Sequence, residues 1–236
     1  MAGPTQLVEI ERILSGERFR RYKAAARDDI ALAIELYQIN IEVSECVFGV
    51  LHLAEVCIRN SMHSALANYI GTPEWFRIGT VLPRTRKPIP YTAPMRDMVS
   101  KGIRSAGHAA SPGKIVAELT FGFWTNLLSS KFQQPLWIPC LYKAFPNFGG
   151  HPRFLHRRME SLQRLRNRIA HHERVLTSNN AVYTGSAVQP YITPQEILQC
   201  VRWTSNDAAA WTEWGTRFRH VIQLLDQFSK RGVQLP

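Results

Sequence analysis

Hydrophobic residues recur at helical spacing along most of the chain. From Asp28 to Ile70 the apolar pattern is almost unbroken and Gly71 follows as a stop signal, which predicts one long helix or two helices that meet near Asn40. Further helices are predicted over residues 7–14, 16–26, 93–106 and 207–230. Because only "AVYTGSAVQPYI" has any strand character, as a loop or a short hairpin, the fold class predicted is all-α.

Local start signals divide the rest of the chain. "GTPEW" and "SPGKIVAEL" each place an N-cap residue before a proline, which predicts helices that begin at Pro73 and Pro112, and "FGFWTNLLSS" continues the second pattern. "TPQE", from Thr193 to Glu196, is a capping box that predicts a helix to about Trp203. Residues 77–92 hold three prolines and four basic residues, which predicts a long loop that faces solvent or RNA.

Charge is the unusual feature of the composition. Twenty-nine Lys and Arg residues against 18 Asp and Glu give a formal net charge of +11, which favours a polyanionic partner. RNA is favoured over a membrane, because the sequence has no lipidation motif and no run of about 18 apolar residues. The N-terminus lacks the order of a secretory signal, and four scattered cysteines in apolar surroundings are typical of reduced core thiols in a cytoplasmic protein.

The stretch "RLRNRIAHHERVL", residues 164–176, combines four arginines with an asparagine and two adjacent histidines. We expect it on a helix that starts just after Pro152 and runs to about Leu176. At 100° per residue, an apolar stripe falls within an arc of about 60° and faces the core. The stripe consists of Leu162, Leu165, Ile169 and Leu176.

The same geometry places the polar residues of this helix. Asn167 and His171, four residues apart, share the face opposite the stripe with Arg164. His172 points toward the edge of the stripe and Arg166 lies on its other flank. The polar face is therefore available to a second subunit, a nucleic acid or both.

Three interpretations compete for these residues. A solvated helix face accounts for single arginines such as Arg164 and Arg168, but less well for the histidine pair. Zinc would need ligands on one face, whereas adjacent helical histidines point about 100° apart, so neither a metal nor another cofactor is expected. Metal-free phosphodiester cleavage needs a histidine that transfers a proton near neutral pH and an arginine that holds phosphate. RNA supplies its own nucleophile, the 2′-hydroxyl.

These residues resemble a known family. "RNRIAHH" is similar to the R-x4-6-H signature of HEPN-domain ribonucleases, and the wider match, over roughly residues 28–180, resembles the Abi-like (abortive infection) family of bacterial proteins. The wider resemblance rests on three stretches: "HLAEVCIRNSMHSALANYIG", "AELTFGFWTNLLSSKFQQPLW…LYKAFPN" and "LQRLRNRIAHHERVL". It implies a HEPN-like helical bundle with additional N- and C-terminal helices, within a single domain of residues 1–236 whose C-terminal extension is residues 181–236.

The resemblance also implies a site and partners. Arg166 matches the signature arginine and Asn167 its polar neighbour. His171 matches the signature histidine with four residues between it and Arg166, and His172, with five between, also fits the signature. Arg164 and Arg168 are expected to support substrate binding. The family implies a homodimer that joins two copies of the motif, metal-independent RNA cleavage, and phage defence or toxin–antitoxin growth arrest, with an antitoxin protein or RNA as a further partner.

A composite site across a two-fold axis also answers a geometric difficulty. In a regular helix Arg166 and His171 are about 140° apart, so both reach one phosphate only if the arginine bends round the helix or if one residue comes from the other subunit. The face argument favours His171 over His172, because His171 points away from the core.

Two other features have plainer interpretations. "EVCIRNSMH" is similar to the motif, but only three residues separate Arg59 from His63. We favour an ion pair between Arg59 and Glu55 in the helix over the alternative that these two residues support the site without contacting the substrate. The aromatic residues of "FGFWTNLL", and Trp211 and Trp214, follow helical spacing, so core or dimer packing is favoured over base stacking. The function expected is endoribonuclease; the alternative is a non-catalytic RNA-binding or protein-interaction module.

The charge yields a first testable prediction. RNA affinity should fall steeply as salt rises, with a log–log slope of several units, because each phosphate contact on a single strand contributes about 0.7. Fluorescence anisotropy with labelled RNA over a salt series measures this slope. An affinity that stays constant between low and moderately high salt contradicts a phosphate-binding role.

Overall fold

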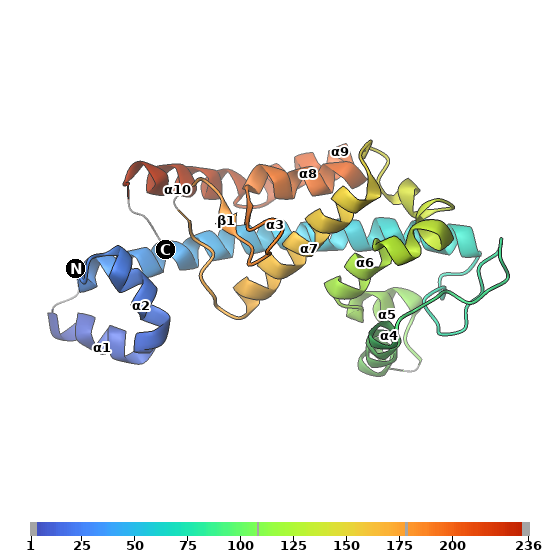
Figure 1. Ribbon diagram of the computed structural model, residues 1–236, viewed down its shortest axis with the longest axis horizontal. Coiled ribbons are helices and arrows are strands. Elements are labelled where there is room, and N and C mark those ends of the chain that lie inside the picture. Colours follow the sequence, from blue (N-terminus) through green and yellow to red (C-terminus); the bar gives the residue numbers. More distant parts are fainter. Residues whose placement is uncertain (1–3, 108, 178, 233–236) are drawn as a thin grey trace. The chain divides into compact units, whose positions relative to one another are not determined.

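The computed structural model describes residues 4–107, 109–177 and 179–232 and is dominated by helices (Figure 1). The first half contains α1 (Pro4–Leu14), α2 (Gly16–Ala25), α3 (Ile30–Ile70), α4 (Ala93–Ala106), α5 (Pro112–Glu118) and α6 (Phe121–Leu127). Short η1 (Ser130–Phe132), η2 (Gln133–Trp137) and η3 (Leu141–Ala144) lead to α7 (Pro152–Ala170). A hairpin of β1 (Val182–Tyr183) and β2 (Tyr191–Ile192) precedes α8 (Pro194–Thr204), α9 (Asn206–Gly215) and α10 (Phe218–Lys230). The all-α prediction is confirmed.

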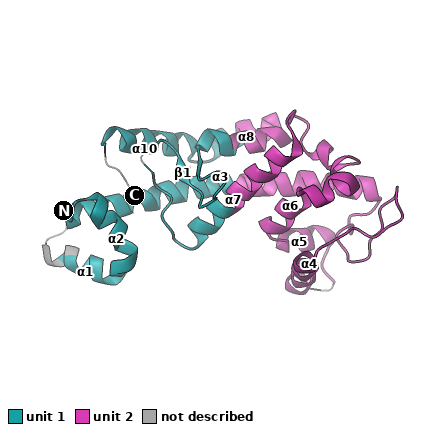
Figure 2. Cartoon of the chain, viewed as in Figure 1, with its two compact units in different colours: residues 1–51, 164–197, 212–236 teal, residues 52–163, 198–211 magenta. Residues whose placement is uncertain are grey.

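The chain forms two compact units, each assembled from separate stretches of sequence (Figure 2). Unit 1 consists of residues 1–51, 164–197 and 212–236, and unit 2 of residues 52–163 and 198–211. The helix α3 is continuous from Ile30 to Ile70, so of the two alternatives, one long helix or two helices meeting near Asn40, the structure shows one helix with Asn40 inside it. The candidate motif, residues 164–176, belongs to unit 1.

Unit 2 is built around aromatic residues. The ring centroid of Trp75 lies 5.8 Å from that of Trp124 and 6.2 Å from that of Phe123, and all three side chains are fully buried. Burial of such rings is a large source of stability. The core interpretation of "FGFWTNLL" is therefore confirmed.

The segment after α3 is not helical, contrary to the start predicted at Pro73. Residues 71–79 form turns in which Thr72 Oγ1 accepts a hydrogen bond from the Glu74 amide at 3.2 Å. Such a side-chain bond competes with helix formation. The turns bury Trp75 and Phe76 completely, so tertiary packing overrides the local start signal.

The C-terminal pattern over 207–230 is split into two helices. α9 ends at Gly215 and α10 begins at Phe218, and between them Thr216 Oγ1 donates to the Thr212 carbonyl at 2.7 Å. Back-bonding of this kind bends helices. Trp211 and Trp214 are 47% and 71% exposed, so of the two alternatives, core or dimer packing, packing in the core is wrong and packing in a dimer stays a prediction.

Other start and stop signals are confirmed. Thr193 and Glu196 form a capping box: the Thr193 amide donates to Glu196 Oε2 at 2.8 Å, and the Glu196 amide donates to Thr193 Oγ1 at 3.2 Å. Gly107 closes α4 with a φ of 94°, a conformation that favours glycine. Residues 77–92 form the expected loop, with one isolated bridge between Val81 and Pro88. All four cysteines are free thiols, as expected.

Candidate functional site

The helix that carries the motif ends earlier than the sequence predicts. α7 stops at Ala170, and the His172 amide donates to the carbonyl of Ile169 at 3.0 Å while the Glu173 amide donates to that of Arg168 at 2.9 Å. These two bonds define a Schellman motif, in which the residue before the last donor adopts a left-handed conformation. That residue is His172, with a φ of 56°.

This ending corrects the expected placement of the two histidines. Because both follow the helix, the regular-helix angles do not describe them, and the 140° estimate for Arg166 and His171 does not apply. His171 and His172 are both exposed, so the expectation that His172 lies at the packed edge is wrong. Leu176 is fully buried, but on an extended segment that bridges to Val182 and not on the helix.

The helical part of the motif follows the expected pattern. Leu162 and Leu165 are fully buried, whereas Arg164 and Asn167 are exposed and Arg166 is half-buried. The exception is Ile169, which was expected in the buried stripe but is only half-buried and lines a cavity. One face of α7 therefore packs into the protein while the face with Arg164 and Asn167 meets solvent.

Asn40 holds the loop that follows the histidines. Its side chain is 5% exposed, and its Oδ1 accepts hydrogen bonds from the amides of Val175 at 2.9 Å and Leu176 at 3.0 Å. Buried backbone amides need partners, and here a side chain from the middle of α3 supplies them. In the sequence Asn40 stands out only as a possible junction between helices, and because Gln38 and Glu42 flank it, no local signal marks it as the anchor of this loop.

Arg168 is a second clamp on the same loop. Its Nη2 and Nε donate to the Arg174 carbonyl at 3.0 and 3.3 Å, and its Nη1 lies 2.7 Å from Glu173 Oε2. Its guanidinium also lies 4.7 Å from the ring centroid of Tyr183, within cation–π range. A side chain so engaged positions the loop, so the structure gives Arg168 a structural task beside the substrate-binding role that the sequence predicts.

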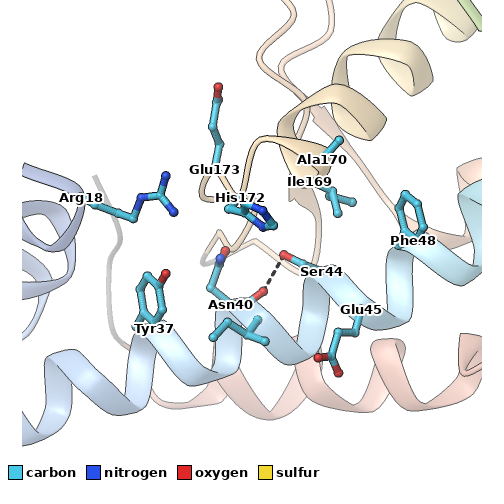
Figure 3. Close-up of a pocket in the computed structure, with 11 residues that line it drawn as sticks. Arg18, Tyr37, Asn40, Ser44, Glu45, Phe48, Ile169, Ala170, His172 and Glu173 are labelled. Carbon is cyan, nitrogen blue, oxygen red and sulfur yellow. Dashed lines mark hydrogen bonds between the residues drawn. The ribbon is translucent and has the colours of Figure 1, made fainter. Parts of the chain in front are cut away.

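Two adjoining cavities of unit 1 open beside the histidine turn. One, of about 510 Å³, is lined mainly by α3 and the end of α7 (Figure 3), and the other, of about 560 Å³, by α2, the 168–174 turn and β1. Four residues line both cavities: Arg18, Tyr37, His172 and Glu173. Of the two histidines, only His172 lines these cavities.

Positive charge gathers in the second cavity. Arg18, Arg21, Arg168 and Arg174 line it together with Glu17 and Glu173. Burial lowers the pKa of Arg174, and the nearby charges of Arg21 and Arg168 lower it further. Crowded cations of this kind favour a bound anion.

The echo of the motif in α3 has a structural role. His63 Nδ1 accepts a hydrogen bond from Trp75 Nε1 at 3.0 Å, and burial, followed by the charge of Arg59, lowers the pKa of His63. Arg59 Nε donates to Asn60 Oδ1 at 3.3 Å. Glu55, Arg59 and His63 all belong to unit 2, whereas the motif belongs to unit 1.

Within residues 4–107, 109–177 and 179–232, no three His, Cys, Asp or Glu side chains gather as metal ligands. Across the same residues, none of the helices combines the length and the apolar character needed to cross a bilayer. Comparison of the chain with protein-family models, with curated proteins and with solved structures found no match.

The Asn40 contacts yield a stability prediction. Asn40→Ala should lower the free energy of unfolding by about 2–4 kcal/mol, because two buried amides lose their acceptor at about 1–3 kcal/mol each. Urea denaturation measures the change. Gln38→Ala, at an exposed position of the same helix, is the matched control and should have little effect. Equal stability of the two variants contradicts the anchoring role.

Proposed function

We propose that the protein is a metal-independent endoribonuclease that cleaves RNA at the residues Arg166 and His171. The observation that carries the proposal is the histidine turn: two adjacent imidazoles follow the helix and are exposed, and one of them, His172, lines a cavity that four arginines also line. A rigid turn supports catalysis because it fixes the direction of the proton-transfer group relative to bound phosphate. The resemblance of "RNRIAHH" to the HEPN signature supports the same assignment.

The reaction needs only groups that the chain and RNA supply. The 2′-oxygen attacks the adjacent phosphorus and loses its proton, while the 5′-oxygen leaves and gains one. His171 transfers a proton, and Arg166 stabilises the charge that develops on the phosphoryl oxygens. The products carry a 2′,3′-cyclic phosphate on one fragment and a 5′-hydroxyl on the other.

The proposed setting is a bacterial defence or toxin system. A homodimer brings two copies of the motif together, and an antitoxin protein or RNA restrains the activity until it is needed. The net charge of +11 supports a polyanionic substrate.

One observation favours the alternative, an RNA-binding module that does not cut. Among the described residues, no carboxylate or other side chain is found in a hydrogen bond with the imidazole of His171 or His172. Catalytic histidines are commonly oriented by such a partner. In the non-catalytic case the same arginines hold phosphate without cleavage.

Cleavage of total RNA in EDTA tests the proposal. His171→Ala should reduce the rate about 10²- to 10⁴-fold through loss of the proton-transfer group. Arg166→Ala should cost a similar factor, and the double variant should be hardly slower, because the two residues act on one transition state. Gel analysis with end-group mapping measures the rates and detects the cyclic phosphate.

Replacement of His172 decides between the two histidines. His172→Gly relieves the left-handed backbone and should keep the fold, so any loss of cleavage reports the imidazole itself. If this variant is inactive while His171→Ala cuts normally, the catalytic histidine is His172. If all variants cut like the wild type, the motif does not perform the chemistry.

Mixed dimers test whether the two subunits share a site. When Arg166→Ala and His171→Ala subunits are mixed and allowed to exchange, a composite site regains roughly a quarter of wild-type activity, because half of the dimers are mixed and each has one intact site. Sites formed within one subunit regain none. Sedimentation that finds only monomer at micromolar concentration excludes the composite site.

A further inference from the structure

A groove in unit 1 combines a partly apolar floor with an arginine, Arg18, at one end. Its floor is one face of α3, where the lining positions are 37, 40, 41, 44, 45 and 48. These positions follow the helical repeat, and Tyr37 and Phe48 are about 16 Å apart along the helix. Figure 3 shows Arg18 at one end, Phe48 at the other and His172 above α3 between them.

The floor exposes apolar side chains that the unit does not cover. Phe48 and Ile41 are each 43% exposed, although both lie on a helix whose neighbouring positions Val43 and Val47 are fully buried. Flat aromatic surface beside positive charge is how proteins stack the bases of single-stranded nucleic acids. The volume of about 510 Å³ lies within the range typical of small-ligand sites.

The cationic end is available for a phosphate. Arg18 lines this end, Arg21 lines the adjoining cavity, and both are exposed; neither lies within 4 Å of a carboxylate among the described residues. Of the acidic residues nearby, Glu173 pairs with Arg168 at 2.7 Å and Glu45 lies 3.9 Å from Arg217, while Glu17 lines the adjoining cavity. An anion at this end would meet a guanidinium that has no carboxylate of the described residues within 4 Å.

From this arrangement we propose that the groove binds one unpaired nucleotide of an RNA strand, with its base on Phe48 and Ile41 and its phosphate on Arg18. His172 closes the groove from above, so this nucleotide lies next to the histidine turn. The inference rests on the proposed function for the identity of the strand as substrate, but not for binding itself.

The test measures binding without cleavage. A labelled single-stranded 2′-O-methyl RNA lacks the nucleophilic hydroxyl, so anisotropy in EDTA reports affinity alone. Inorganic polyphosphate is the second probe, because it carries the charge and no base. Phe48→Ala should weaken binding of the strand about 5- to 100-fold, the value of one stacked base, and leave polyphosphate binding unchanged. Arg18→Gln should weaken both probes and lower the salt slope by about 0.7.

Matched variants control for charge and for exposed aromatic surface. Arg20→Gln, at an exposed position of α2 outside both cavities, and Trp214→Ala, at a 71% exposed ring, should leave the affinities for both probes unchanged. Phe48→Tyr keeps a ring and should retain binding. Because Phe48 is half-exposed, thermal unfolding should show that Phe48→Ala folds; if it does not, Phe48→Leu replaces it in the comparison.

Several outcomes overturn the proposal. The first is that Phe48→Ala weakens the affinity for the strand and the affinity for polyphosphate equally. The second is that a free nucleoside monophosphate binds as tightly as the strand, which makes the ligand a mononucleotide. A Phe48→Ala protein that turns from dimer to monomer identifies the groove as a contact with a second copy. If the wild type binds as expected but does not cut RNA, the nucleotide groove is supported and the proposed cleavage is contradicted. If the wild type cuts RNA while Phe48→Ala binds the strand normally, the proposed cleavage is supported and the nucleotide groove is contradicted.

Discussion

The two hydrogen bonds that Asn40 accepts govern how unit 1 presents its motif. A helix interior offers no spare backbone groups, so a buried loop that crosses α3 must find its partners on a side chain. Asn40 Oδ1 meets this need for the amides of Val175 and Leu176. Asn40 lies within about 2.2 helical turns of every residue of the groove floor. The loop therefore crosses α3 at one fixed point, and the histidine turn that precedes it is fixed as well.

The arginines around this turn divide into two groups with different tasks. Arg168 donates to the carbonyl of Arg174, and Arg174 in turn donates to that of Leu176 at 2.9 Å, so both stabilise the path of the loop. Arg18 and Arg21 approach the same cavity from α2 without such bonds. A net charge of +11 therefore overstates what is available to a ligand, because part of it maintains the backbone. Among the described residues of this cavity, the arginines of α2 are those that make no such backbone bonds.

Helical periodicity predicted the elements whose ends are set by short-range signals. α3, α4 and α8 begin and end near the residues that the sequence indicates, and α5 begins at the predicted Pro112, because glycine, proline and capping side chains act locally. The errors fall at residues 71–79, 171–176 and 215–217, and at the break between α5 and α6, where the sequence predicts a continuous pattern. In the first, buried tryptophan and phenylalanine rings decide the backbone; in the second, a partner 135 residues distant in sequence does. No local sequence pattern encodes these two long-range contacts. The groove was missed for the same reason, because its lining comes from α2, α3 and the end of α7.

The backbone at His172 links the turn to function. A left-handed C′ position is usually glycine, because a β-carbon is strained there, and His172 keeps its side chain at a φ of 56°. Strain that packing does not require is concentrated in proteins at functional sites. The imidazole of His172 is exposed and lines both cavities. The turn separates the histidine pair: His172 lines both cavities, whereas His171 lies outside them, directly after the arginine-bearing helix. In the proposed site His172 would therefore contact the bound nucleotide, and the early end of α7 is what gives it this position.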